Sequence, residues 1–297
     1  MCKNITSKTL FSTAMIISFV SVALRCVNLF FFFDTEPGYY TSGAILPIVS
    51  HILLFLFSAA IIIISLLCFR GTEISYLKPT GIRQGLLYLP TVLFNATLFC
   101  DILKLSGNKT HSFLFILFAA ISSFYFIYDL ISPSLTVRIA LGISTIGSLI
   151  AILATSYFDQ TVQMNSPDKI LVGLCAIFSA LFVASEMKAL MGTGRNWLYT
   201  ASAMLTALFG FTCSLPSIIG YHAGLISTQR SFYAEYYLIL AMAIYASIRL
   251  FPGAAQEAYA VSDTVAPSSD TDLPCGDEMI EAEQDEGEQS EATRDEQ

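Results

Sequence analysis

Apolar residues dominate eight separate stretches of this 297-residue chain, and short polar segments separate the stretches from one another. Each stretch has about 17 to 26 residues, enough for a helix to cross the hydrocarbon core of a bilayer. Because lipid offers no hydrogen-bond partner to open backbone groups, we expect all eight to be helical. The pattern predicts an all-α, polytopic transmembrane bundle of eight helices. The stretches are Leu10–Phe33, Ala44–Phe69, Gly85–Asp101, Ser112–Ile131, Thr136–Phe158, Ile170–Leu190, Trp197–Ile219 and Ser231–Leu250.

Polar residues inside the stretches are the strongest pointers to function, because ionisable groups in hydrocarbon are costly and usually face a bundle interior. In the first stretch, four polar residues recur at helical spacing and form one stripe, which should face inward. They are Ser18, Ser21, Arg25 and Asn28. Together with polar residues of other stretches, two of them give a candidate intramembrane polar cluster. Its members are Arg25, Asn28, His51, Asn95, Asp101 and Glu235.

The charged residues of the stretches fall into an outer and an inner layer. Arg25 belongs to the outer layer and needs a carboxylate when it is withdrawn from water. We expect that partner to be Asp101, Asp34 or Glu235. The inner layer holds Asp129 and Glu186, and we interpret both as helix-end charges that reach toward the membrane interface.

Composition agrees with the apolar pattern and adds a second region. Charged residues make up only 13% of the chain, about half the share of an average soluble protein. Fourteen of the 23 acidic residues lie between residues 257 and 297, where one arginine is the only basic residue. A segment so acidic and so poor in apolar residues cannot bury enough surface to fold. We therefore expect a transmembrane bundle over residues 1–251 and a disordered acidic tail over residues 252–297.

The positions of lysine and arginine predict the orientation, since cytoplasmic loops are enriched in basic residues. With the N-terminus in the cytoplasm, nine basic residues flank the cytoplasmic ends of the stretches and four flank the outer ends. The first outer loop, residues 34–43, has two acids and no basic residue. An even number of stretches then places both termini, and the acidic tail, in the cytoplasm.

Arg25 and the loop that follows the first stretch carry a resemblance to known proteins. The loop reads Asp34-Thr35-Glu36-Pro37-Gly38-Tyr39-Tyr40. An arginine in the first helix followed by an acidic, glycine- and tyrosine-containing loop resembles multi-pass inner-membrane proteins of Gram-positive anaerobic bacteria. The resemblance implies a bacterial cell membrane location and no particular chemistry.

No motif in the chain indicates catalysis. The zinc-protease pattern H-E-x-x-H, the nucleophile elbow G-x-S-x-G and the phosphate loop G-x-x-x-x-G-K-[ST] are all absent from the sequence. We predict no catalytic residue, metal or cofactor. The bilayer is the expected partner, a protein or small-molecule partner stays open, and nothing indicates nucleic acid.

Three hypotheses remain for the function. The first is a non-catalytic accessory or sensing membrane protein whose polar stripes hold the helices together. The second is a small-molecule permease whose path is lined by inward-facing residues of the first three helices. The third is an intramembrane enzyme, which lacks any recognisable pair of nucleophile and base. A continuous polar cavity would favour the permease, and a dry interior would favour the first hypothesis.

Overall fold

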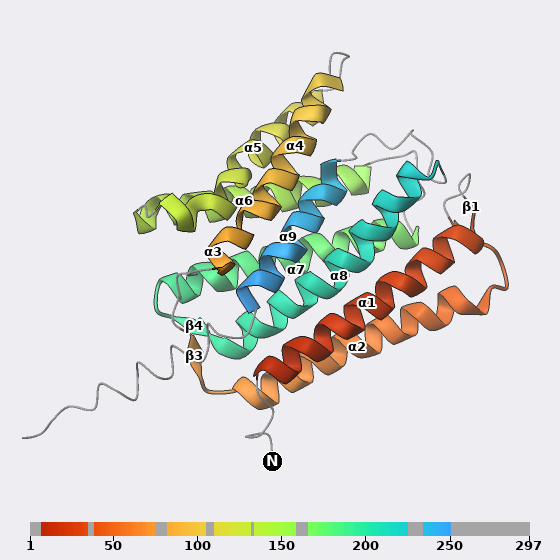
Figure 1. The fold of residues 1–297 in the computed structure, drawn as a ribbon, viewed down its shortest axis with the longest axis horizontal. Helices are drawn as coiled ribbons and strands as arrows, with labels where there is room; N and C mark the ends of the chain where they lie inside the picture. Colours follow the sequence, from red (N-terminus) through yellow and green to blue (C-terminus); the bar gives the residue numbers. More distant parts are fainter. Residues whose placement is uncertain are drawn as a thin grey trace, which may run out of the picture.

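The computed structural model describes residues 7–34, 39–74, 82–104, 110–131, 134–158, 166–224 and 234–250. These residues form a bundle of eight long helices, one short helix and two small strand pairs, which confirms the predicted fold class (Figure 1). The predicted tail, residues 252–297, lies outside the described residues. The helices are α1 (Ser7–Phe31), α2 (Ile45–Phe69), α3 (Ile82–Leu86), α4 (Tyr88–Lys104), α5 (Thr110–Ile131), α6 (Leu135–Phe158), α7 (Pro167–Leu190), α8 (Asn196–His222) and α9 (Ala234–Leu250).

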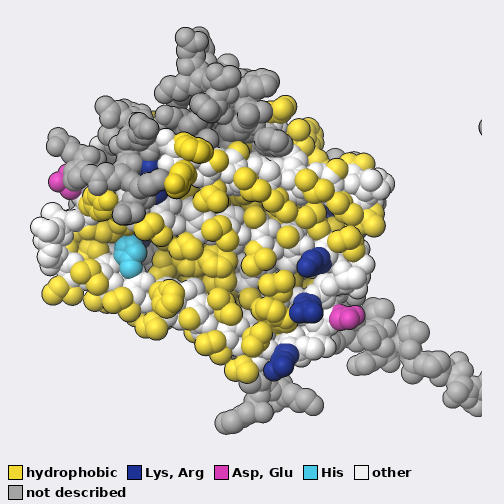
Figure 2. All heavy atoms as spheres, turned by 180° about the vertical axis from the view of Figure 1, so that it is seen from behind, with side chains coloured by type: hydrophobic (Ala, Val, Ile, Leu, Met, Phe, Trp, Pro, Cys, Tyr) yellow, Lys and Arg dark blue, Asp and Glu magenta, His cyan; other side chains and the backbone are white. Residues whose placement is uncertain are grey.

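The chain is an integral membrane protein by the length and composition of these helices. Five helices of the described part, α1, α2, α6, α7 and α8, are long and apolar enough to cross a membrane. The surface agrees, because large apolar side chains such as Phe19, Phe55 and Phe158 are more than 70% exposed. Figure 2 shows a broad hydrophobic face with basic side chains gathered toward one end. Lipid tails are the environment in which such a face is stable.

Two strand pairs mark the two ends of the bundle. At one end, β1 (Phe33–Asp34) pairs antiparallel with β2 (Tyr39–Tyr40) in the loop between α1 and α2. At the other end, β3 (Glu73–Ile74) pairs antiparallel with β4 (Gly194–Arg195). This pairing joins the loop after α2 to the loop between α7 and α8. We call these the hairpin end and the ladder end.

Helices α7, α8 and α9 form the centre of the bundle. The α1–α2 pair packs mainly on α8. On the other side α4 packs on α9 and α6 packs on α7, while α5 packs between α4 and α6 (Figure 1). In α8, 78% of the most apolar segment is buried, against 22% in α2. Helix α8 is therefore an interior helix, and α2 presents most of its surface to lipid.

A proline explains why the third predicted span is two helices. The structure ends α3 at Leu86 and begins α4 at Tyr88, so the break falls at Leu87. Pro90 has no backbone N–H, and its ring would clash with the carbonyl four residues earlier if the helix were continuous. The Thr91 hydroxyl donates to the Leu87 carbonyl at 3.2 Å and so satisfies an acceptor at the break.

Small residues allow α8 and α9 to approach closely. A methyl group placed on Gly210 would lie 2.7 Å from the Ala243 Cβ and 3.3 Å from the Ile239 carbonyl oxygen. Neither atom belongs to a flexible side chain, so the helices themselves would have to separate. Close packing of small residues of this kind is a main source of helix association in lipid.

We expect Gly210→Ala to lower the stability of the protein, because overpacking typically costs about 1–3 kcal/mol. The matched control is Gly173→Ala in α7, where an added methyl would meet only the Leu153 side chain at 3.4 Å. There the higher helix propensity of alanine should leave stability unchanged or raise it by about 0.5–1 kcal/mol. Melting temperatures of the two purified variants test this, and equal values would contradict the close approach.

Candidate functional site

The polar stripe of α1 faces the interior, as its spacing predicts. Ser18, Ser21, Arg25 and Asn28 are all buried, with 2%, 7%, 4% and 1% of their surface exposed. On the opposite side of the same helix, Phe19 is 74% exposed. Helix α1 therefore packs its polar face toward α8 and exposes its apolar face to lipid.

Arg25 forms a buried ion pair with the first turn of α7. Its Nη2 atom lies 2.6 Å from Asp168 Oδ1, and both side chains are about 5% exposed. The other carboxylate oxygen, Oδ2, accepts a hydrogen bond from the Tyr236 hydroxyl of α9 at 2.7 Å. This group ties α1, α7 and α9 together at the hairpin end. A buried arginine with a direct carboxylate partner needs no further countercharge.

The structure corrects the expected partner of Arg25. The prediction that Arg25 is buried and paired with an acid is confirmed, but the partner is Asp168 and not one of the three acids that we expected. The predicted span began at Ile170, so Asp168 appeared to be a loop residue. In the structure Ser166 caps α7 by accepting a hydrogen bond from the Lys169 N–H at 3.3 Å. This cap and Pro167 start the helix earlier and place Asp168 inside the bundle.

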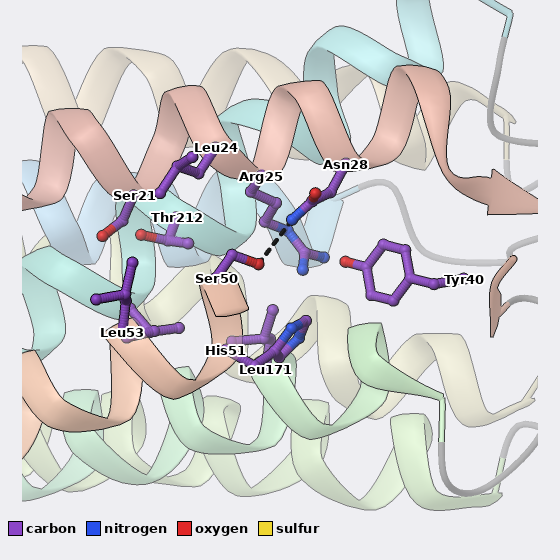
Figure 3. A pocket seen from close by; sticks show the side chains of 11 residues that line it. Ser21, Leu24, Arg25, Asn28, Tyr40, Ser50, His51, Leu53, Leu171 and Thr212 are labelled. Carbon is purple, nitrogen blue, oxygen red and sulfur yellow. Dashed lines mark hydrogen bonds between the residues drawn. The ribbon is translucent and has the colours of Figure 1, made fainter. Parts of the chain in front are cut away.

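Asn28 and His51 lie beside Arg25, so the structure brings three of the predicted cluster residues together. The Asn28 amide donates to Ser50 Oγ at 2.7 Å. Ser50 Oγ and His51 Nδ1 both lie within hydrogen-bond distance of the Pro47 carbonyl, at 2.8 and 2.6 Å. Figure 3 shows the Tyr40 hydroxyl pointing toward the Arg25 guanidinium, with the His51 ring below it.

These side chains line a small cavity between α1, α2, α7 and α8. It has about 20 Å³ of free space, which is enough for roughly one water-sized group. Two buried polar atoms at its wall, Arg25 Nε and Asn28 Oδ1, have no hydrogen-bond partner among the described residues. One is a donor and the other is an acceptor.

A larger apolar groove adjoins this cavity. It has about 640 Å³ of free space and is lined by the Tyr40–Ala44 loop, the first turns of α2 and α7, and Phe209 of α8. Tyr40, His51, Leu54 and Leu171 line both the cavity and the groove. The polar residues around Arg25 thus border an apolar surface that opens toward the lipid face.

The other predicted cluster residues lie elsewhere or cannot be placed. Asn95 is on α4, where its amide donates to the Thr91 carbonyl of its own helix at 2.9 Å, and it does not line the cavity. Glu235 is 8% exposed in the first turn of α9, next to Tyr236. The side chains of Asp101 and Asp129 lie outside the described part of the structure.

A second buried ionic group surrounds Glu186 at the ladder end. Its carboxylate lies 2.7 Å from Arg249 Nε and 3.8 Å from Arg138 Nη2. It also accepts hydrogen bonds from two tyrosine hydroxyls, that of Tyr245 at 2.9 and 3.0 Å and that of Tyr125. We call these five side chains the Glu186 cluster. It connects α5, α6, α7 and α9.

The Glu186 cluster overturns our interpretation of Glu186 as a helix-end charge. The Glu186 side chain is 0% exposed, and those of Arg138 and Arg249 are 8% and 5% exposed. A residue that reaches toward the membrane interface would be partly exposed. The two arginines also entered the orientation count as loop-flanking charges, whereas the structure buries both. In the sequence, Glu186 is a single carboxylate near the end of an apolar stretch. Its position does not indicate that four partners from three other helices surround it.

One spacing in the sequence does connect the two buried acids. Asp168 and Glu186 are eighteen residues apart in α7, which corresponds to five full turns and about 27 Å of helix. They therefore lie on one face of α7, close to its two ends. This periodicity was available in the sequence as a signal, but it requires that α7 begin at Pro167.

Neither ionic group contains a set of side chains suited to a metal ion. Within the described residues, no cluster of three or more histidine, cysteine, aspartate or glutamate side chains could hold a metal ion. Both buried carboxylates are already engaged by arginine and tyrosine. Comparison of the chain with protein-family models, with curated proteins and with solved structures found no match.

Proposed function

We propose that this chain is a non-catalytic accessory or sensing protein of the cell membrane, with its two buried ionic groups acting as clamps between helices. The observation that carries the proposal is the closure of these groups: Asp168 and Glu186 are each bound by arginine and tyrosine from neighbouring helices. The free space beside Arg25 admits about one water-sized group, which is too small for a metabolite. A closed polar interior supports a structural role over transport.

The proposal includes eight spans with both termini in the cytoplasm, which makes the hairpin end the outer end. Exposed basic residues at the ladder end support this orientation, since Arg70, Lys188 and Arg195 lie there. At the hairpin end, the exposed charge of the strand pair is Asp34. The resemblance of the Arg25 region to membrane proteins of Gram-positive anaerobes would make this membrane bacterial.

Labelling of single cysteines tests both the closed interior and the orientation. The seven native cysteines are replaced by alanine or serine, and one cysteine is introduced at a time. Ser42→Cys lies in the exposed loop at the hairpin end, Thr193→Cys is exposed at the ladder end, and Ser21→Cys lines the cavity. A membrane-impermeant thiol reagent is added to intact cells and then to permeabilised cells.

We expect Ser42→Cys to react in intact cells, Thr193→Cys to react only after permeabilisation, and Ser21→Cys to react in neither case. Reaction of Ser21→Cys in folded protein would mean that water reaches the interior, and it would favour the permease. Reaction of Thr193→Cys in intact cells would reverse the orientation. Denatured protein provides the control that each cysteine is chemically competent.

A further inference from the structure

We propose that the groove between α2 and α7 binds one bilayer lipid that carries a free hydroxyl, with its acyl chain along the groove and its hydroxyl between Arg25 and Asn28. The inference rests on the proposed function and deepens it, because it names what a sensing protein of this fold would bind. Three observations carry it: the dimensions of the groove, the gradient of polarity along it, and the two unpaired polar atoms behind it.

The groove matches one acyl chain in length and chemistry. Its lining runs from Ala44, the residue before α2, to Phe55 of α2, which is about 17 Å and close to one leaflet of the hydrocarbon core. Its walls include Ile48, Ile52 and Ile170, which are 60%, 55% and 54% exposed. A polar metabolite would gain nothing from these side chains, whereas an acyl chain reaches them directly from the bilayer.

The mouth of the groove is polar. Tyr40, Thr41 and Ser42 lie at the hairpin end of the groove, and His51 lies one α2 turn beyond Pro47. Headgroup atoms at this position would meet hydroxyl and imidazole groups at the depth where a bilayer changes from hydrocarbon to headgroups. A lipid in the membrane would therefore place its headgroup at the polar mouth of the groove and its acyl chain along the apolar walls.

The unpaired atoms define the headgroup. Arg25 Nε is a donor and Asn28 Oδ1 is an acceptor, and both side chains are at least nine-tenths buried. A hydroxyl accepts one hydrogen bond and donates another, so it offers the acceptor that Arg25 Nε lacks and the donor that Asn28 Oδ1 lacks. A phosphate oxygen only accepts and would leave Asn28 Oδ1 unpaired. The nearby Asp168 carboxylate, which neutralises Arg25, also argues against an anionic headgroup.

The probe for the test is a diacylglycerol with brominated acyl chains, since bromine quenches a tryptophan that it contacts. Its matched control is the brominated diester of 1,2-propanediol, which differs only by the missing hydroxyl. In a Trp197→Phe background, the reporter is Phe55→Trp in the groove. The control reporter is Phe19→Trp on the lipid-facing side of α1, because Phe55 and Phe19 are similarly exposed, at 72% and 74%.

The bilayers are phosphatidylcholine with a few mole per cent of brominated lipid. We expect the diacylglycerol to be enriched about tenfold at the Phe55→Trp reporter relative to the Phe19→Trp reporter. This factor corresponds to one or two buried hydrogen bonds. The diester should quench both reporters equally. Asn28→Ala should abolish the enrichment, whereas Ser50→Ala keeps the Oδ1 acceptor and should retain it. Ile170→Phe fills the groove from an exposed position and should also abolish it without disturbing the core.

Equal quenching of both reporters by the diacylglycerol would overturn the inference. Equal enrichment of the diacylglycerol and the diester in the groove would also overturn it, because a water would then be satisfying Arg25 and Asn28. Either failure leaves the result at Ser21→Cys unaffected, since labelling of the interior does not depend on which lipid occupies the groove. The two proposals can therefore fail separately.

Discussion

Replacement of Glu186 by glutamine should be the most damaging single change in this protein. The substitution keeps the size of the side chain but removes the charge that Arg249 and Arg138 face. Removing one partner of a buried ion pair leaves the other charge uncompensated and typically costs about 3–5 kcal/mol. For a bundle of this size we expect a melting temperature lower by roughly 10 °C. Thermal unfolding of the detergent-purified protein, followed by circular dichroism, measures it.

The matched control for Glu186→Gln is Lys188→Gln, two residues later on α7. Lys188 is exposed, and surface ion pairs contribute about 0–1 kcal/mol. Its replacement should leave the melting temperature within about 2 °C of that of the wild type. Similar losses for the two variants would mean that Glu186 is not the centre of a buried cluster.

Separation of Arg25 from Asp168 should have the second largest effect, and a double-mutant cycle can assign it to this pair. We expect Arg25→Leu and Asp168→Leu each to lower stability by about 3–5 kcal/mol, because each leaves a buried charge behind. The double variant has no buried charge left over from the pair and should recover part of the loss. The interaction term should be about 2–3 kcal/mol and should change little with salt, since buried pairs are weakly screened.

The same cycle with Asp34→Asn in place of Asp168→Leu is the control. Asp34 was an expected partner of Arg25 from the sequence, but it is an exposed residue of β1. Its effect should add to that of Arg25→Leu within about 0.5 kcal/mol. A larger coupling to Asp34 than to Asp168 would contradict the geometry at the hairpin end.

The fold could be predicted from the sequence because the bilayer imposes simple rules on length and polarity. All eight apolar stretches are helical, although the third is interrupted at Leu87, and the stripe at Ser18, Ser21, Arg25 and Asn28 is buried as its spacing predicts. The errors lie at helix boundaries. Hydropathy excluded Pro167 and Asp168 from the sixth stretch, whereas a serine cap and a proline begin α7 there.

The partners of the buried charges could not be predicted, because they come from helices that are distant in the sequence. Glu186 is bound by Tyr125, Arg138, Tyr245 and Arg249, and hydropathy treats each of these as an ordinary helix or loop residue. Which of them meet depends on how α5, α6, α7 and α9 pack. Tyrosine adds a further difficulty, because its ring suits an apolar stretch while its hydroxyl supplies the hydrogen bond.

The sequence separation of Arg25 and Asp168 also affects how the protein is made. Asp168 is the 143rd residue after Arg25, so the ribosome reaches it about 7–30 s later at ordinary rates of synthesis. During this time the nascent α1–α2 pair has neither α8 to pack on nor a carboxylate on α7. Arg25 lies six residues before the end of α1, about 9 Å from it, so its side chain can reach the aqueous surface meanwhile. Because Arg25 lies near the end of α1, the α1–α2 pair can stay inserted in the bilayer with the arginine hydrated until α7 is synthesised.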